Sequence, residues 1–254
     1  MEKWMIALEK FLSDWKDKDK IIGVLVCGSF VTGGASKHSD IDVQIILDNE
    51  VTWRERGNKI VDGFLIEYFA NPLYRYEGYF EEDYSRNRTV TAHMFATGKI
   101  IFDKTGDLTK LVVVAKKFLK KKFVKPKRAF IEMNKYHLWD ALDNLGEVLD
   151  NNSKEFYFVY YSGLRDIYEV YSKFCRMNVS QSNKVERFLI NKKDREKYLI
   201  NDFPDEVFVK LFSKALVLNS PKKMFSNYKC LCLHVFRKMG GFEIDGWKFR
   251  SPAK

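Results

Sequence analysis

The stretch IIGVLVCGSFVTGGASKHSDIDVQIIL, residues 21–47, decides the fold of this 254-residue chain. Its first seven residues, 21–27, form a short apolar run that is rich in β-branched side chains, and such a run predicts a buried strand. A loop containing several glycines follows. From residue 40 polar and apolar residues alternate, so we expect a second strand over 40–47.

Two carboxylates, Asp40 and Asp42, stand on this second predicted strand. Residues two apart in a strand point to the same face, so these acids should lie side by side. Like charges at that separation repel each other, and a divalent cation relieves the repulsion. Mg²⁺ prefers hard oxygen ligands and is usually held by one or two carboxylates together with substrate phosphates. The pair therefore predicts a magnesium site.

The loop between the strands begins with Gly28-Ser29. A glycine lets a backbone amide approach a phosphate closely, where a side chain would obstruct it. The hydroxyl of Ser29 can hydrogen-bond the same phosphate. The loop and the carboxylates together predict a triphosphate site that faces a metal site.

A third acid, Glu67, lies in the apolar run FLIEYF at residues 64–69. We expect a third strand over 59–69, with Asp62-Gly63 forming a bulge or a turn inside it, and a short helix or loop over 51–57. If this strand lies beside the second one, Glu67 faces the other two acids and completes a two-ion site. Asp62 is the alternative third acid, but its place at a glycine turn predicts exposure.

The remainder of the chain indicates an α/β unit over 1–105 and an all-helical unit over 106–254. Apolar residues at helical spacing predict a first helix over 2–17, one or two helices over 73–97 and a short strand over 99–103. From residue 108 we expect helices only. Their breaks are expected near Pro126, Asn151-Asn152, residues 178–183, Pro204 and Ser220-Pro221.

Composition excludes several classes of protein. The chain is 46% hydrophobic and 31% charged, as in ordinary folded proteins, so wholesale disorder is not expected. No apolar run approaches the roughly 18 residues of a membrane span, and the charged N-terminus lacks the apolar core of a signal peptide. Four scattered cysteines are too few for a disulfide framework. We therefore expect a cytoplasmic protein with reduced thiols and no membrane partner.

Charge is distributed unevenly. Residues 1–105 carry 14 Lys and Arg against 17 Asp and Glu, whereas residues 106–254 carry 30 against 17, a net charge of +13. The densest stretch, KKFLKKKFVKPKR at 116–128, has eight basic residues in thirteen. A second half with this positive charge favours anionic ligands, namely nucleotides, nucleic acid or acidic lipid. A solvated helix face explains the basic residues equally well.

The pattern of an apolar strand, Gly28-Ser29, ten intervening residues and Asp40-Ile41-Asp42 resembles the signature of the DNA polymerase beta-like nucleotidyltransferase superfamily. A third acid on a following strand belongs to that signature. With its helical second half, the chain resembles the small antibiotic nucleotidyltransferases, such as the kanamycin, streptomycin and lincosamide enzymes. The resemblance implies an α/β (α+β) nucleotidyltransferase fold with a small mixed β-sheet, followed by an all-helical domain.

The resemblance also implies a chemistry. A nucleoside triphosphate, with ATP expected, binds with Mg²⁺, and a hydroxyl of a small acceptor attacks the α-phosphorus as pyrophosphate leaves. Asp40 and Asp42 would hold both metal ions, and Glu67 would complete the one that activates the attacking hydroxyl. In the kanamycin-type enzymes the base comes from the helical part, where Asp140, Glu155 and Asp166 are possible counterparts. Lys37, Arg86 and Arg88 are the candidates for holding the triphosphate.

Two other functions remain open. One is the same chemistry with an RNA acceptor, which the basic half favours although no RNA-binding module is recognisable. The other is a non-catalytic nucleotide-binding or antitoxin-like module, which the presence of all three acids opposes. The sequence leaves the oligomeric state open.

The remaining motifs have simpler explanations. His38 is expected to be a solvated loop residue, and Cys230-Leu-Cys232-Leu-His234 lacks a second ligand pair for zinc. The chain has neither a P-loop nor a dinucleotide-binding fingerprint. Tyr160, Tyr161 and Arg165 lie in an aromatic-rich segment that predicts a core helix, with a cleft wall as the alternative.

Overall fold

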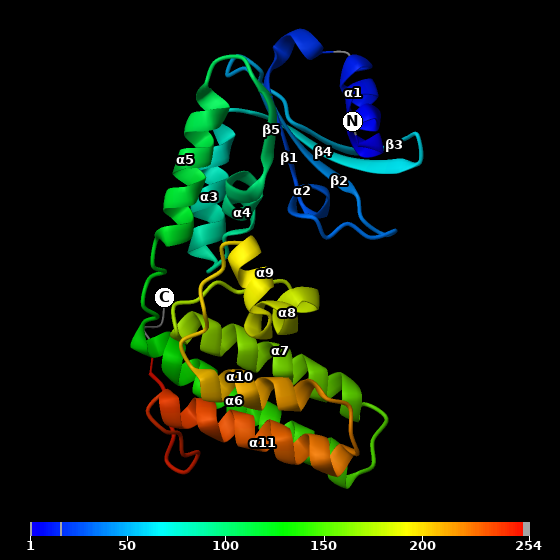
Figure 1. Cartoon of the computed structure of the whole chain (residues 1–254). Helices are drawn as coiled ribbons and strands as arrows, with labels where there is room; N and C mark the ends of the chain where they lie inside the picture. The colour runs from blue at the N-terminus through cyan, green and yellow to red at the C-terminus, as the bar shows by residue number, and fades with distance from the viewer. Residues whose placement is uncertain (1, 16, 251–254) are drawn as a thin grey trace. The chain divides into compact units, whose positions relative to one another are not determined.

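The computed structural model describes residues 2–15 and 17–250 of the chain and contains two compact units (Figure 1). The first unit comprises residues 1–121 together with 193–200, and the second comprises 122–192 and 201–254. The first unit therefore includes a segment from late in the sequence. The predicted domain boundary after residue 105 stays a prediction; the compact first unit extends past it because the helix over 107–120 packs there.

The first unit is built on a mixed five-stranded sheet. Its strands are β1 (Ile21–Cys27), β2 (Ile41–Leu47), β3 (Glu55–Val61), β4 (Phe64–Pro72) and β5 (Lys99–Asp103), in the order β3-β4-β2-β1-β5. β2 and β4 are parallel, while the other neighbours are antiparallel. This confirms the small mixed sheet that the resemblance implied.

Helices cover both faces of this sheet (Figure 1). The amphipathic α1 (Lys3–Ser13) buries Leu8 and Phe11 against Val24 and Val43, which point to one face. The opposite face packs on α3 (Arg75–Ser85), α4 (Val90–Thr97) and α5 (Asp107–Lys120). Both faces of the central strands are thus buried, which explains why β1 reads as a nearly continuous apolar run.

Short helices complete the first unit. They are the 3₁₀ turn η1 (Lys18–Lys20), α2 (Ser29–Thr32) directly after β1, and α9 (Lys192–Lys197), most of which lies in the late segment of this unit.

The predicted third strand over 59–69 was wrong in extent, because the chain forms a hairpin there. Asp62 and Gly63, with φ of 49° and 82°, make a two-residue turn between β3 and β4. Asp-Gly is a favoured sequence for hairpin turns in which both residues have positive φ. β3 lies at the edge of the sheet and exposes most of its polar residues, so it lacks the apolar alternation that would have indicated a strand over 55–61.

The second unit consists of helices around one apolar core. It contains α6 (Arg128–Asp150), α7 (Phe156–Phe174), the 3₁₀ turn η2 (Ser182–Lys184), α8 (Val185–Ile190), α10 (Glu206–Leu216) and α11 (Pro221–Lys238). Each predicted break falls between two of the helices or at a helix start, which confirms the all-helical second half. Tyr160 lies in this core, as expected for a core helix, whereas Tyr161 is exposed.

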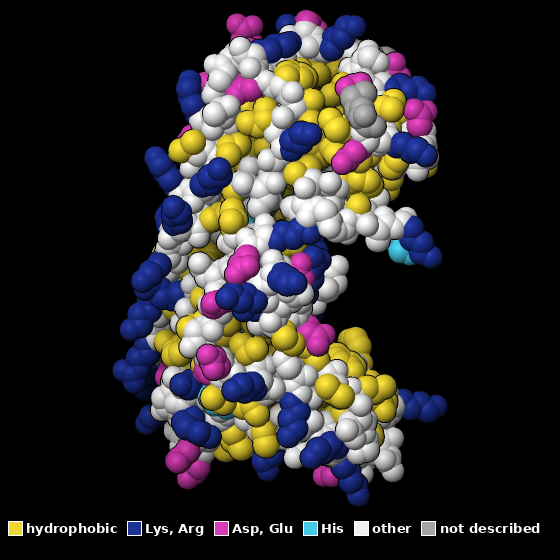
Figure 2. Space-filling view, in the orientation of Figure 1, with side chains coloured by type: hydrophobic (Ala, Val, Ile, Leu, Met, Phe, Trp, Pro, Cys, Tyr) yellow, Lys and Arg dark blue, Asp and Glu magenta, His cyan; other side chains and the backbone are white. Residues whose placement is uncertain are grey.

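Among the described residues, no helix combines the length and the apolar character needed to cross a membrane. The eight basic residues within 116–128 are all exposed, and Figure 2 shows dark-blue side chains along the α5 side of the molecule.

A buried polar cluster anchors α10 in the second unit. Asp205 caps this helix by accepting a hydrogen bond from the amide of Phe208 at 3.0 Å. Its other oxygen, Oδ2, accepts from the Tyr171 hydroxyl at 2.5 Å and lies 2.8 Å from Nε2 of His234. Burial alone would raise the pKa of Asp205, but these hydrogen bonds lower it to about 2.

We expect this cluster to make the stability of the protein depend on acid. Because the pKa of Asp205 is lower in the folded state, its contribution is present above the ordinary carboxyl pKa. The contribution is lost as pH falls from about 4 towards 2 and amounts to about 2 kcal/mol. The difference in free energy of urea unfolding between wild type and Asp205→Asn should therefore shrink over this interval. A difference that is constant from pH 5 to pH 2.5 would contradict the assignment.

Candidate active site

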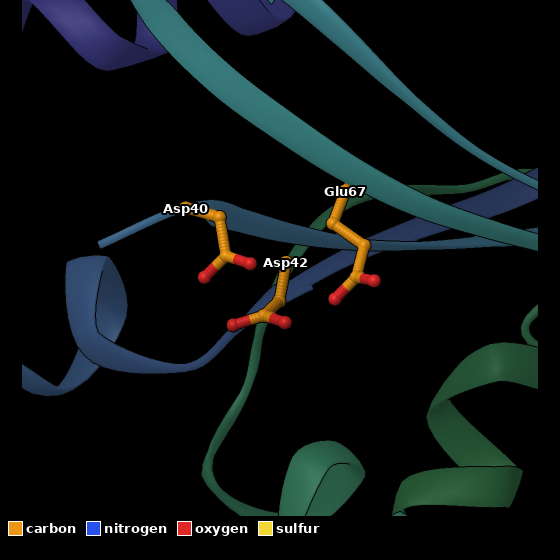
Figure 3. Close-up of side chains that lie close together, drawn as sticks. All are labelled: Asp40, Asp42 and Glu67. Atoms are coloured by element: carbon orange, nitrogen blue, oxygen red, sulfur yellow. The ribbon is translucent and has the colours of Figure 1, made fainter. Parts of the chain in front are cut away.

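Three carboxylates converge on the face of the sheet that α3, α4 and α5 cover. β2 and β4 pair in parallel with Asp42 opposite Glu67, and Asp40 lies two residues before Asp42. One oxygen from each acid can be chosen so that all three lie within 4.8 Å of one another. Figure 3 shows the three side chains pointing into the same space. The structure therefore brings together the acids that the sequence predicted to meet.

The three acids create a strongly negative environment. All three are half-buried, so they are neither fully hydrated nor sealed from solvent. The thiol of Cys27, which pairs with Asp42 across β1 and β2, reports this environment. Burial raises the pKa of this thiol, and the negative charges of Asp42, Asp40 and Glu67 raise it further. Three hard oxygen donors in such a cluster match the ligand preference of Mg²⁺.

Arg56 is a member of the site that the sequence analysis missed. Its Nη2 lies 2.7 Å from Oε1 of Glu67, and its guanidinium lies 4.7 Å from the centre of the Phe69 ring. Arg56 is opposite Phe69 in the β3–β4 hairpin. An Asp-Gly hairpin turn at 62–63 fixes that register, so recognising the turn would have placed Arg56 beside Glu67.

Gly28 lies against the carboxylate of Asp42. Its φ of 76° and ψ of −157° are accessible almost only to glycine. A Cβ at this position would lie 2.1 Å from Oδ2 of Asp42, so a side chain would force this carboxylate or the backbone to shift. Ser29 begins α2 immediately afterwards, and Gly33 ends it in the left-handed conformation. The Gly28-Ser29 backbone is therefore next to the acids, as the sequence predicted.

The predicted phosphate-binding side chains lie on exposed segments. Lys37 is in the loop between α2 and β2, beside the equally exposed His38. Arg88 follows α3 in a turn where its amide donates to the carbonyl of Asp83 at 2.8 Å. Arg86 pairs with Glu82 at 3.0 Å. Neither Lys37 nor Arg88 forms an ion pair with the three acids within the described part of the chain. Their role stays a prediction.

The candidate bases of the helical half have partners within their own unit. Asp166 lies 3.2 Å from Nε2 of His137, and Asp140 accepts from the amide of Asn144 at 3.2 Å. A hydrogen bond from Ser153 lowers the pKa of Glu155. A choice among the three acids stays open.

The other suspected metal motif does not form a site. Cys230 is exposed, whereas Cys232 and His234 are buried, and His234 is bonded to Asp205. Within residues 2–15 and 17–250, the only group of three or more His, Cys, Asp or Glu with suitable geometry is Asp40, Asp42 and Glu67.

Comparison with known proteins points to the same segment. Residues 8–91 match the family described as nucleotidyltransferase domain, and this range contains the strand, the Gly28-Ser29 loop and all three acids. No curated protein is significantly similar to the chain.

Among solved structures, the chain is similar to a nucleotidyltransferase-like protein from Exiguobacterium sibiricum. The TM-score is 0.46 and the sequence identity 10%, over 92% of this chain and 75% of that one. This similarity is too weak to establish a shared fold.

The contact between Gly28 and Asp42 yields a prediction with an internal control. Gly28→Ala should destabilise the protein by about 2–4 kcal/mol, because it adds backbone strain to a clash with Oδ2 of Asp42. Gly33→Ala shares the positive φ but meets nothing within 4 Å, so it should cost only about 1 kcal/mol.

Urea unfolding of the two variants measures these costs, and thermal unfolding with and without Mg²⁺ reports on the acids. We expect Mg²⁺ to raise the Tm of wild type and of Gly33→Ala and to leave that of Gly28→Ala unchanged. Equal costs and equal Mg²⁺ responses would show that the close approach to Asp42 is unimportant.

Proposed function

Since the chain carries a nucleotidyltransferase domain of the DNA polymerase beta-like superfamily, we propose that it moves a nucleoside monophosphate from a nucleoside triphosphate to a hydroxyl of a small acceptor. ATP is the proposed nucleotide and pyrophosphate the second product. The observation that carries the proposal is the convergence of Asp40, Asp42 and Glu67 within 4.8 Å beside the Gly28-Ser29 loop.

The donor set fits a pair of magnesium ions. Asp40 and Asp42 would be shared by both ions, and Glu67 would bind the one next to the acceptor. When bound, Mg²⁺ would neutralise triphosphate charge and lower the pKa of the attacking hydroxyl. The two aspartates come from one strand and the glutamate from its neighbour, so the sheet itself fixes their spacing.

The chain's own groups would orient the reacting atoms. The acceptor oxygen forms a bond to the α-phosphorus as the bond from that phosphorus to the pyrophosphate oxygen breaks. The hydroxyl proton passes to a carboxylate, and Glu67 is the one proposed to take it. Arg56 holds Oε1 of Glu67, which would keep this side chain in one orientation and leave Oε2 available for the metal or the proton.

The triphosphate would lie along the loop that starts at Gly28. The missing side chain of Gly28 leaves room for the carboxylate of Asp42 and so brings the loop backbone against the acids, and the Ser29 hydroxyl would donate to one of the phosphates. Lys37 and Arg88 would supply the positive charge from exposed positions.

A small molecule is the proposed acceptor, and RNA is the alternative. The exposed basic residues over 116–128 favour a polyanion, since clustered Lys and Arg attract phosphate backbones. A non-catalytic module is disfavoured because all three acids are present and meet in space.

Removing one shared ligand should abolish transfer while leaving the fold intact. We expect Asp42→Asn to reduce pyrophosphate release from ATP by at least about a thousandfold, because metal stabilisation supplies several kcal/mol of barrier lowering. Its thermal stability without Mg²⁺ should not fall, since the change relieves repulsion between acids. Asp62→Asn is the matched control, because Asp62 pairs with Lys10 away from the site. Wild-type turnover in Asp42→Asn would refute the proposal.

Replacing the third acid should separate catalysis from binding. Glu67→Gln is expected to lower kcat by about a hundredfold or more while the affinity for ATP changes little, because this ligand acts mainly in the transition state. Steady-state kinetics and calorimetric titration with ATP measure the two effects. A collapse of ATP affinity with kcat preserved would assign Glu67 to nucleotide binding instead.

The charge of the helical half predicts the class of acceptor. A net charge of +13 over residues 106–254 should repel polycations at long range, so neutral or anionic hydroxylated compounds should outperform kanamycin as acceptors. Asp140, Asp143, Glu147 and Asp150 lie along α6 and would favour a cation locally. Calorimetry of the ATP-loaded protein with kanamycin decides between them, since micromolar binding would overturn the charge argument. Radiolabel transfer from ATP to RNA, rather than to the small molecules, would establish the alternative acceptor.

A further inference from the structure

The first unit contains a segment that the apolar core does not hold. Residues 193–200 belong to this unit although the chain on either side of them belongs to the other. None of these eight residues is buried, and α9 contributes nothing to the core. A polar contact, between Tyr198 and Thr32, links the segment to the rest of the unit.

Tyr198 lies in a tight turn directly after α9. The amide of Ile200 donates to the carbonyl of Arg195 at 2.8 Å, and that of Leu199 donates to the carbonyl of Glu196 at 3.3 Å. This pair of bonds defines a helix ending whose left-handed residue is usually glycine. Here the position is taken by Leu199, with φ of 54°. A leucine in this conformation is strained, and such strain persists where surrounding contacts require it.

Tyr198 is hydrogen-bonded to the loop that starts at Gly28. Its hydroxyl lies 3.0 Å from Oγ1 of Thr32, the last residue of α2. Oγ1 of Thr32 in turn donates to the carbonyl of Gly28 at 3.0 Å. A threonine hydroxyl has one proton, and the Gly28 carbonyl takes it. Tyr198 must therefore donate to Thr32, and its bond continues through Thr32 to the backbone that lies against Asp42.

The loop needs such external support. α2 has four residues, fewer than an isolated helix needs for stability. Gly28 and Gly33 flank it, both at positive φ, and no atom lies within 4 Å of where a side chain of Gly33 would be. The contact from Tyr198 is thus a restraint on a short helix between two flexible residues.

We propose that Tyr198 is a positioning residue for the nucleotide: it holds the Gly28–Gly33 loop, through Thr32, in the conformation that receives the triphosphate. This role rests on the proposed function of that loop. Tyr198 is a positioning residue in this proposal, because the role rests on the bond between its hydroxyl and Thr32. The coupling is reciprocal. If the contact of residues 193–200 with the loop increases the affinity for the triphosphate by some factor, a bound triphosphate should stabilise that contact by the same factor.

The first test needs no nucleotide. In the free full-length protein, Tyr198→Phe removes only the hydroxyl, and hydrogen exchange at amides 29–34 should accelerate about fivefold, the equivalent of one neutral hydrogen bond. Tyr74→Phe is the control, because Tyr74 is an exposed tyrosine of the same unit that directly precedes α3, outside the Gly28–Gly33 loop. Unchanged exchange in Tyr198→Phe would overturn the proposal.

The second test measures the consequence for binding. Tyr198→Phe should raise the Kd and KM for Mg·ATP about fivefold while kcat at saturating ATP changes less than twofold and Tm stays within a degree or two. Thr32→Val should have a similar or larger effect, and the double variant should be no weaker in binding than Thr32→Val alone, because the two changes remove one shared bond. Additive losses would overturn the shared network.

The two tests also separate this inference from the proposed function. If wild type binds and transfers ATP normally but Tyr198→Phe matches it in affinity and exchange, only the positioning role fails. If wild type neither binds nor transfers any nucleoside triphosphate, the proposed function fails, and the positioning role fails with it. Slower exchange at residues 194–200 on adding Mg·ATP to wild type is the expected reciprocal effect, and unaltered exchange there despite tight binding would contradict it.

Discussion

The parallel pairing of β2 with β4 is the constraint on which the site depends. It places Asp42 opposite Glu67, and the strand period brings Asp40 to the same side, so three negative charges meet within 4.8 Å. Their mutual repulsion must be tolerated by the fold. The two buried faces of the sheet hold the strands rigid, while half-exposure and the guanidinium of Arg56 moderate the charge. A cluster of carboxylates held in this way is suited to bind cations.

Much of this arrangement could be predicted because it depends on local patterns. The apolar run of β1 and the alternation in β2 predicted both strands, and the two-residue period predicted that Asp40 and Asp42 share a face. The resemblance at residues 21–70 is confirmed at the level of the superfamily by the match over 8–91. Glu67 could be identified because a carboxylate within an apolar run is costly to bury unless it has a partner.

The parts that escaped prediction depend on contacts without an apolar signal. β3 is an exposed edge strand, so its sequence resembles a loop, and Arg56 was lost with it. None of residues 193–200 is fully buried, and the contact of Tyr198 with Thr32 is polar, so no apolar periodicity in the sequence indicates it. Gly28 was recognised as permissive, but only the structure explains why: the space of its missing side chain is occupied by Asp42.

The metal and nucleotide chemistry is assigned to the inner strands β2 and β4 and to the Gly28–Gly33 loop, and the central claim is that the three acids bind cations as a unit. Counting bound Mn²⁺ by electron paramagnetic resonance, in the presence of a non-hydrolysable ATP analogue, tests this most directly. Wild type should bind Mn²⁺ at micromolar concentration with a signal altered by the analogue, and Asp40→Asn/Asp42→Asn should bind none at the same concentration. Equal Mn²⁺ binding by the two proteins would contradict the account.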